Sequence, residues 1–237
     1  MPTESLTEIR ELTVPTLANA VELFGVVRPN EGYNRRPVTC HFPELGMCAG
    51  YAVTVTARTD SSADAMDEPK YWSWLESQPG PKIVVVQDLD DPPGGAMWGE
   101  WNANVHRALG CVGTITEGAV RDLDALDRLG FHAFATSVSV AHGYGVFVDY
   151  GTPVEVAGLR ITTGDLLVAD RHGFLRIPDE IPIDELCAVA RRIDALEAEI
   201  FAYCSGDGFT VDGLAALQDS VLARWPRPRA LKGPAGR

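Results

Sequence analysis

The sequence has few lysines and no long apolar run. Only three of its 237 residues are lysine, Lys70, Lys82 and Lys232, and the other basic residues are arginines. Chemistry through a lysine Schiff base therefore has only three candidate residues. No run of about 18 apolar residues is present, and the opening MPTESLTEIRE lacks the apolar segment of a signal peptide. We therefore predict a cytoplasmic protein.

Positive charge is also scarce. Lys plus Arg number 20 against 33 Asp plus Glu, which gives a formal net charge of −13. A field of this sign repels phosphate backbones and anionic membrane surfaces, so neither nucleic acid nor a membrane is an expected partner. If the substrate is an anion, its site must contain a local cation, either an arginine or a metal ion.

Cysteine and histidine are too scattered for the usual disulfide and metal patterns. The five cysteines are odd in number and lack CxxC spacing, which favours buried thiols over a disulfide framework. The five histidines show no HxH or HExxH spacing, a GxSxG elbow is absent, and the AHGYG segment lacks the lysine of a phosphate-binding loop. We predict nothing beyond polar contacts for His41, His142 and His172.

The hydrophobic pattern predicts one α/β domain over residues 1–225, followed by a disordered Pro/Gly/Arg tail at 226–237. Two short helices separated at Pro15 are expected within 5–23, and further helices at 71–77, 97–109 and 123–129. Strands are expected at 49–57, 82–91, 111–116 and 132–136. Short strands in a meander or small barrel should fill 145–178, and two extra helices should follow at 183–204 and 210–225.

Three aspartates, Asp88, Asp90 and Asp91, stand at the tip of the strand expected at 82–91. The VVVQDLDD segment resembles the strand-then-DxD arrangement of haloacid dehalogenase-type phosphotransferases, in which such carboxylates bind a hard cation. The threonine expected next is missing, and the element falls late in the chain. Solvated turn aspartates are therefore the favoured interpretation.

The most informative stretch runs from Trp98 to Leu126 and contains Arg121 beside Asp122. Arg121 offers a planar fork for a carboxylate, and Asp122 offers a hard oxygen to Mg²⁺ at the start of a helix. The plainer interpretation is that Asp122 caps the helix while Arg121 forms a surface ion pair. The chemistry of these two residues does not choose between the two interpretations.

Several motifs in order resemble the RraA-like family, which includes the 4-hydroxy-4-methyl-2-oxoglutarate/4-carboxy-4-hydroxy-2-oxoadipate aldolases and the regulators of ribonuclease E activity. Gly99-Glu100 opens a helix, and Arg121-Asp122 follows some twenty residues later. Between them lie glycines at 110, 113 and 118, and beyond them the stretch TPVEVAGLRITTGDLLVADRHGFLRIP is similar to the family's later signature. With TLANAVELFG near the N-terminus, the resemblance covers about residues 10–200.

The resemblance implies a single-domain α/β sandwich of the swivelling β/β/α type, assembled as a homotrimer or hexamer with sites between subunits. It implies that Arg121 binds the substrate carboxylate and that Asp122 anchors Mg²⁺ or Mn²⁺, largely through waters. Backbone amides near Gly99, Trp101 and Asn102 would hold the pyruvyl carboxylate, and Glu100 would position or activate a water. A further glutamate would come from the neighbouring subunit, with Glu197 and Glu199 as the two candidates. All eight positions carry the named residues in this sequence.

These roles together predict a metal-dependent lyase that cleaves a 2-oxo-4-hydroxy dicarboxylic acid by a retro-aldol reaction and releases pyruvate. The enolate left by the cleavage needs a lysine or a metal as electron sink, and no lysine is placed in an apolar pocket by the sequence. Because oxaloacetate forms the same enolate when it loses CO₂, its decarboxylation is also expected. Two alternatives remain: a non-catalytic regulator that binds a protein partner, and a related metal-enolate enzyme. Residues 29–46 and 139–151 depart from the family's usual segments, so the substrate is not fixed.

Overall fold

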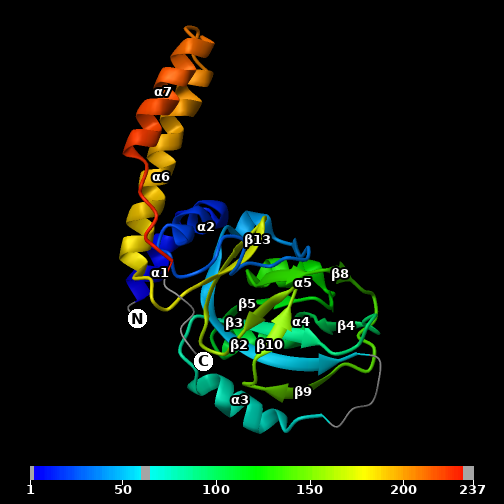
Figure 1. Ribbon diagram of the computed structural model, residues 1–237. Helices are drawn as coiled ribbons and strands as arrows, with labels where there is room; N and C mark the ends of the chain where they lie inside the picture. Colours follow the sequence, from blue (N-terminus) through cyan, green and yellow to red (C-terminus); the bar gives the residue numbers. More distant parts are fainter. Residues whose placement is uncertain (1–2, 60–64, 232–237) are drawn as a thin grey trace. The chain divides into compact units, whose positions relative to one another are not determined.

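The computed structural model describes residues 3–59 and 65–231 (Figure 1). Its internal contacts divide the chain into two compact units, one of residues 32–179 and one that combines residues up to 31 with those from 180 onward. None of the helices in the described ranges is both long enough and apolar enough to span a membrane. That residues 1–225 form one domain stays a prediction.

The unit of residues 32–179 is built on an eight-stranded mixed sheet with the order β1-β7-β5-β3-β2-β12-β13, in which β9 also pairs with β2. Strands β2, β3, β5 and β7 run parallel. The long strand β2 pairs with β3 along one edge, and with β12 and then β9 along the other. The bounds are β1 Thr39–Cys40, β2 Cys48–Arg58, β3 Lys82–Asp88, β5 Cys111–Thr116, β7 His132–Ala135, β9 Val146–Tyr150, β12 Leu166–Asp170 and β13 Gly173–Ile177.

The core lies on both faces of this sheet. In β3, Val84 and Val86 join the cluster that packs against α3, while Ile83 and Val85 face the β10–β11 hairpin. Successive side chains of a strand point to opposite faces, and a strand covered on both faces is apolar throughout, which explains the IVVV run. The covering elements are α3 Glu68–Ser77, α4 Glu100–Ala108, α5 Leu123–Leu129, β10 Val154–Val156 and β11 Leu159–Ile161.

A small parallel sheet of three short strands completes this unit: β4 Ala96–Trp98, β6 Ala119–Val120 and β8 Ser137–Val138. A 3-10 turn spans Pro43–Leu45. The helix predicted from Met97 begins later, at Glu100, because residues 96–98 pair with β6 as a strand. The predicted strand at 82–91 ends at Asp88. Within the predicted meander, β9 and β12 both pair with β2 instead of with each other.

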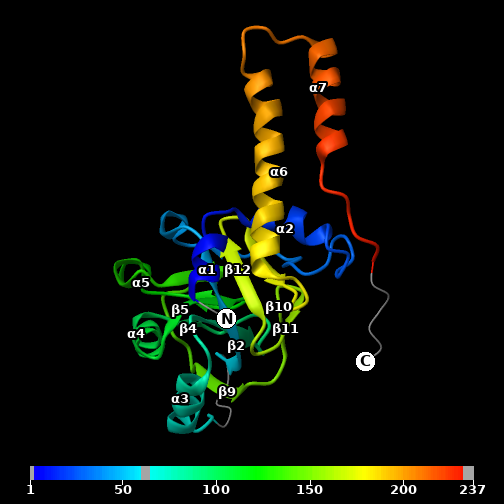
Figure 2. The ribbon, with the colours of Figure 1, turned by 90° about the vertical axis from the view of Figure 1, so that its left-hand side faces the viewer.

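The other unit consists of α1 Thr3–Ile9, α2 Val14–Glu22, α6 Ile183–Cys204 and α7 Val211–Arg224. Thr13 caps α2 by accepting a hydrogen bond from the Thr16 amide, and Pro15 lies in the first turn, where proline is tolerated. Helix α6 has the predicted bounds, and α7 runs back alongside it as a hairpin (Figure 2). The extra C-terminal helices predicted from the sequence are therefore present.

The described part of the predicted tail, residues 226–231, has no helix or strand, and Lys232 and the residues after it lie outside the described ranges. Arg229 forms an ion pair with Glu185 at 2.9 Å, and its guanidinium lies 4.6 Å from the centre of the Phe24 ring. Its amide also donates to the Leu23 carbonyl. Disorder of the tail stays a prediction, but Arg229 is attached to the body of its unit.

Candidate active site

Arg121 and Asp122 lie between β6 and α5, and Asp122 has an unusual backbone conformation. Its φ of 56° and ψ of 40° are left-handed, which for a residue other than glycine costs on the order of 1–3 kcal/mol. Asp122 occupies the cap position of α5, yet its side chain does not cap that helix. Its Oδ2 accepts a hydrogen bond from the Glu100 amide at 3.0 Å and lies 3.4 Å from Arg121 Nε. The carboxylate is therefore directed to the start of α4.

Gly99 makes this approach between two segments possible. A Cβ at Gly99 would lie 2.6 Å from Asp122 Oδ2, closer than Cβ atoms pack in proteins, and 3.0 Å from Arg121 Cγ, which is tighter than most such contacts. Any side chain at this position would push the carboxylate and the guanidinium away from α4. Glycine is therefore required at position 99, because α4 packs closely on the Arg121-Asp122 turn.

A cavity of about 190 Å³ opens beside this turn, and we call it the arginine cavity. It is lined by Ala96, Met97, Gly99, Trp101, Asn102, Arg121, His142 and Gly145. A neighbouring hollow shares Trp101 and Arg121 with it and adds Glu100, Asn104, Val105 and Asp122. The structure therefore brings together the six residues that the sequence placed at the site in this unit, and adds His142, for which the sequence predicted nothing beyond polar contacts.

The first turn of α4 presents backbone N–H groups to this region. The amides of Trp101 and Asn102 lie in the first turn, where no carbonyl of the helix itself can accept their hydrogen bonds. The positive end of the helix dipole adds to their attraction for an anion. The Asn102 side chain donates to the Met97 carbonyl at 2.7 Å, which ties the turn to β4. Trp101 is 78% exposed, so its indole is available to a ligand or to another surface.

Behind this turn, His106 anchors α4 to the core. The Asn102 carbonyl can only accept, so His106 Nδ1 donates to it at 2.7 Å, and Nε2 then accepts from the Tyr71 hydroxyl at 2.8 Å. Burial lowers the pKa of His106 to about 4, which keeps the ring neutral near pH 7. The pair is structural: it holds the helix whose first turn borders the arginine cavity.

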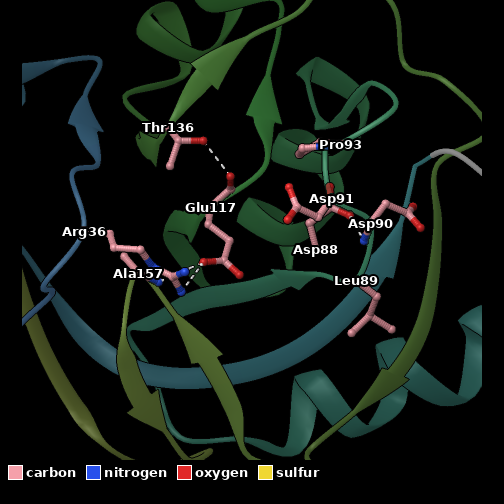
Figure 3. Close-up of a pocket in the computed structure, with 9 residues that line it drawn as sticks. All are labelled: Arg36, Asp88, Leu89, Asp90, Asp91, Pro93, Glu117, Thr136 and Ala157. Carbon is pink, nitrogen blue, oxygen red and sulfur yellow. Dashed lines mark hydrogen bonds and ion pairs between the residues drawn. The ribbon is translucent and has the colours of Figure 1, made fainter.

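A second cavity, of about 300 Å³, lies at the carboxyl ends of the parallel strands β3, β5 and β7, where ligands of α/β proteins commonly bind (Figure 3). We call it the acid cavity. It is lined by Arg36, Asp88, Leu89, Asp90, Asp91, Pro93, Glu117, Thr136 and Ala157. Four carboxylates against one guanidinium give it a negative potential, so an anionic substrate is disfavoured there.

The carboxylates of the acid cavity are largely committed to the protein. Asp88 is 8% exposed, and its two oxygens accept from the Thr59 hydroxyl at 3.2 Å and the Asp90 amide at 3.0 Å. Burial raises the pKa of Asp88, and the charges of Asp90 and Glu117 raise it further. Asp90 itself pairs with Arg58 at 2.8 Å, and Figure 3 shows Glu117 directed to Arg36, which it contacts at 3.1 Å.

The described residues include no group of three or more His, Cys, Asp or Glu side chains arranged to hold a metal ion. Asp88 and Asp90 contact neighbouring protein groups, and Asp88 is buried and not solvated as the sequence suggested, whereas Asp91 is exposed. Neither cavity is lined by a lysine of the described ranges. Lys82 is 4% exposed at the start of β3, where it donates to the Leu75 carbonyl at 2.8 Å. Asp88 lies at the opposite end of the same strand.

Glu197 and Glu199 lie on α6, in the other unit. The Glu199 carboxylate accepts from both terminal nitrogens of Arg224 at 2.7 Å, and this pair lowers its pKa. Glu197 is half-buried and forms no ion pair within the described chain. Their role at the site stays a prediction, but they differ in availability, because the Glu199 carboxylate is already paired.

Comparison with known proteins places these observations in a family context. The family model described as RraA-like, Aldolase/RraA, matches residues 14–176. A protein of Halalkalibacterium halodurans named "Putative 4-hydroxy-4-methyl-2-oxoglutarate aldolase" is 30% identical over 123 residues, which are 52% of this chain and 58% of that protein. The match thus spans little more than half of that relative.

Solved structures show the same fold. An uncharacterized protein from Pseudomonas syringae pv. tomato superposes with a TM-score of 0.70 at 21% identity, over 93% of this chain and 95% of the other. Streptomyces coelicolor RraAS2, described as an unusual member of the RNase ES inhibitor RraA protein family, superposes with a TM-score of 0.62 at 21% identity, over 85% and 96%. At these identities the likeness establishes the fold alone.

Proposed function

The chain belongs to the Aldolase/RraA family, and from that premise we propose that it is a divalent-metal-dependent lyase. Its substrate would be a 2-oxo-4-hydroxy dicarboxylic acid, cleaved by a retro-aldol reaction that releases pyruvate. The observation that carries the proposal is the juxtaposition of the Asp122 carboxylate, the Arg121 guanidinium and the first turn of α4 around one cavity. The relative named as an aldolase supports the same class of reaction.

The anionic substrate requires local positive potential in a protein of net charge −13. The amides of Trp101 and Asn102 would bind the pyruvyl carboxylate at the start of α4, and Arg121 would add charge-assisted hydrogen bonds of about 1.5–3 kcal/mol. Arg121 is about one-third exposed, so it is accessible from the cavity without a rearrangement of the fold.

The residues present fit a divalent cation held mainly through waters. Asp122 Oδ2 is fixed by the Glu100 amide, the Asp122 side chain is 35% exposed, and Glu100 lines the same hollow. Mg²⁺ commonly uses one or two protein carboxylates and keeps several waters, and Mn²⁺ accepts the same oxygen ligands. When bound, the ion would supply Lewis-acid stabilisation of the enolate charge. Glu100 would orient a water and accept its proton.

Oxaloacetate decarboxylation follows from the same arrangement, because loss of CO₂ leaves the same enolate of pyruvate. A homotrimer or hexamer with sites between subunits is the assembly we propose, with a glutamate of α6 donated to a neighbouring subunit. Between the two candidates we favour Glu197, because the Glu199 carboxylate is occupied on both oxygens by Arg224.

A regulator without catalytic activity is the second candidate. The net charge of −13 suits a surface that binds basic segments of a partner protein, and one structural neighbour is described as a member of an RNase inhibitor family. A regulator needs neither a bound metal nor the Asp122 carboxylate, so the same experiment separates the two candidates.

The experiment measures pyruvate release from oxaloacetate and from 4-hydroxy-4-methyl-2-oxoglutarate, with Mg²⁺ and with a chelator. Asp122→Asn removes the charge while keeping a residue type that tolerates the left-handed backbone, and Arg121→Ala removes the guanidinium. We expect each variant to lose about 100-fold or more of kcat/KM. The matched controls Asp91→Asn and Arg36→Ala, in the acid cavity, should stay within about threefold of wild type. Release that persists with the chelator, or no release at all, would reject the proposed lyase.

A further inference from the structure

One titratable side chain at the arginine cavity has no part in the proposed reaction. His142 lines the cavity together with Arg121, and its ring makes no hydrogen bond to any described residue. The remaining lining residues are neutral, and apart from Asn102 and the Trp101 indole their side chains offer no polar group. Arg121 and His142 are therefore the two basic side chains of this lining.

The backbone around His142 is fixed by unusually close packing. A Cβ on Gly95 would lie 2.8 Å from the His142 carbonyl carbon and 2.5 Å from the Gly143 nitrogen, so the two segments touch backbone to backbone. The Ala96 amide also donates to the Ala141 carbonyl at 2.9 Å. We call this contact between residues 94–96 and 141–143 the glycine seam.

Thr59 stabilises the glycine seam through two hydrogen bonds. It is 1% exposed and directly follows β2. Its hydroxyl accepts from the Gly94 amide at 2.9 Å, and its carbonyl accepts from the Tyr144 amide at 3.1 Å. A Cβ on Gly143, whose φ is +60°, would collide with the Thr59 carbonyl oxygen. The His142 backbone is thus held in place at the cavity wall by contacts on either side of it.

The proposed substrate has a second carboxylate that the start of α4 does not accommodate. The amides of Trp101 and Asn102 and the Arg121 guanidinium serve the 2-oxo acid end. In the adjoining hollow, Asp122 and Glu100 are assigned to the cation, and a carboxylate cannot donate a hydrogen bond to a second carboxylate. A distal carboxylate therefore needs a hydrogen-bond donor elsewhere on the wall of the cavity. An imidazole N–H at a fixed backbone position, with no partner of its own in the described chain, meets this need.

We propose that His142 is a specificity-determining residue: its imidazole donates to the carboxylate at the end of the substrate remote from the 2-oxo acid. This inference rests on the proposed function, because it concerns the substrate of the same site. It assigns the preference for a dicarboxylic over a monocarboxylic 2-oxo acid to one side chain.

The test compares two substrates that differ only at the distal group. 4-Hydroxy-4-methyl-2-oxoglutarate has a carboxylate there, and 4-hydroxy-4-methyl-2-oxopentanoate has a methyl group in its place. For His142→Leu we expect kcat/KM for the first to fall about 10- to 100-fold, mainly through KM, and the ratio between the two substrates to fall by the same factor. His142→Asn, which retains an N–H donor, should restore part of the ratio.

His172→Leu is the matched control, because His172 lies on the turn between β12 and β13 and pairs with Asp170 there at 3.1 Å. It should leave the substrate ratio at the wild-type value. An equal loss for both substrates in His142→Leu, or no loss for either, would overturn the inference while the proposed lyase still stands.

A binding measurement keeps the inference testable without turnover. 2-Oxoglutarate and 2-oxopentanoate lack the hydroxyl needed for retro-aldol cleavage and differ in the distal carboxylate alone. Calorimetry with Mg²⁺ should show tighter binding of 2-oxoglutarate to wild type, with the difference reduced about tenfold or more in His142→Leu. Equal binding of the two acids to wild type would overturn the inference, whereas loss of turnover alone would count against the proposed reaction.

Discussion

The arginine cavity and the acid cavity share one packing feature but differ in the charge of the side chains that line them. In each, a glycine is pressed against an aspartate: a Cβ would lie 2.6 Å from Asp122 Oδ2 at Gly99, and 2.9 Å from Asp88 Oδ2 at Gly118. Around Asp122 the chain places a guanidinium, an imidazole and the start of a helix. The lining around Asp88 has three more carboxylates and one arginine, Arg36.

This difference shows that a perturbed carboxylate is not automatically the reactive one. The pKa of Asp88 is raised, which by itself is a common sign of a functional group. Both of its oxygens, however, accept hydrogen bonds, one from the Thr59 hydroxyl and one from the Asp90 amide. Asp122 is about one-third exposed and is held through one oxygen. The availability of the carboxylate, more than its pKa, separates the candidate active site from the structural cluster.

The largest effect should come from Gly99→Ala. Because the new methyl group would meet the Asp122 carboxylate and the Arg121 side chain, both must move away from α4. We expect kcat/KM for pyruvate release to fall about 100-fold or more, since small displacements of catalytic groups are costly. Steady-state kinetics with oxaloacetate and Mg²⁺ measure the loss.

Gly118→Ala is the control that compares the two cavities directly. Its methyl group would displace Asp88, so we expect a loss of about 1–2 kcal/mol in the free energy of unfolding and less than a tenfold change in kcat/KM. If the two alanine variants lost activity equally, the distinction between the cavities would be wrong.

Tyr71→Phe should have a smaller effect, on stability, because it removes the hydrogen bond to His106, which anchors α4 next to the arginine cavity. It leaves His106 Nε2 buried without a donor and should lower the free energy of unfolding by about 1–3 kcal/mol.

The folded-state pKa of His106, about 4, lies below the ordinary 6.5, so the stability contributed by the neutral ring is complete above pH 6.5. It is lost as pH falls towards about 4. Urea unfolding of wild type at pH 7 and pH 4.5 should show this decline, and a flat profile over that interval would contradict it.

The smallest effect concerns Asp88→Asn in the acid cavity. Because the pKa of Asp88 is raised above 3.8 in the folded state, its contribution to stability is complete below pH 3.8 and is lost as pH rises through the folded-state value. Asparagine cannot ionise, so the variant should gain stability relative to wild type over the same rise. Unfolding curves at pH 3.5, 5 and 7 measure the difference, and a relative loss at pH 7 would show that the ionised carboxylate is stabilising.

The sequence predicts most of the fold because its longer elements are locally encoded. Helix α6 has one continuous apolar stripe through Leu186, Ala190 and Ile193, so both of its ends could be predicted. Strand β4 was missed because three residues, Ala96–Trp98, carry no periodic signal and become a strand only through pairing with β6, more than twenty residues later. Its apolar residues instead appeared to extend the helix that follows.

The candidate site could be predicted only where its residues are adjacent in sequence. Gly99 with Glu100, and Arg121 with Asp122, each form a short local motif, and the structure brings the two motifs together. His142 could not be found in this way, because its place at the cavity depends on the non-local glycine seam and on Thr59. The lack of HxH or HExxH spacing also gave no reason to select it.

The glycine seam has a consequence for how this protein can diversify. Since Gly95 and Gly143 meet backbone to backbone, an inserted residue on either side would separate the segments and disrupt the wall of the arginine cavity. Loop lengthening, a common evolutionary route to new substrates, is therefore blocked at this wall. Substitution at the single position between Ala141 and Gly143 remains open, so a small library of variants at that codon would sample the substrate range accessible to this scaffold.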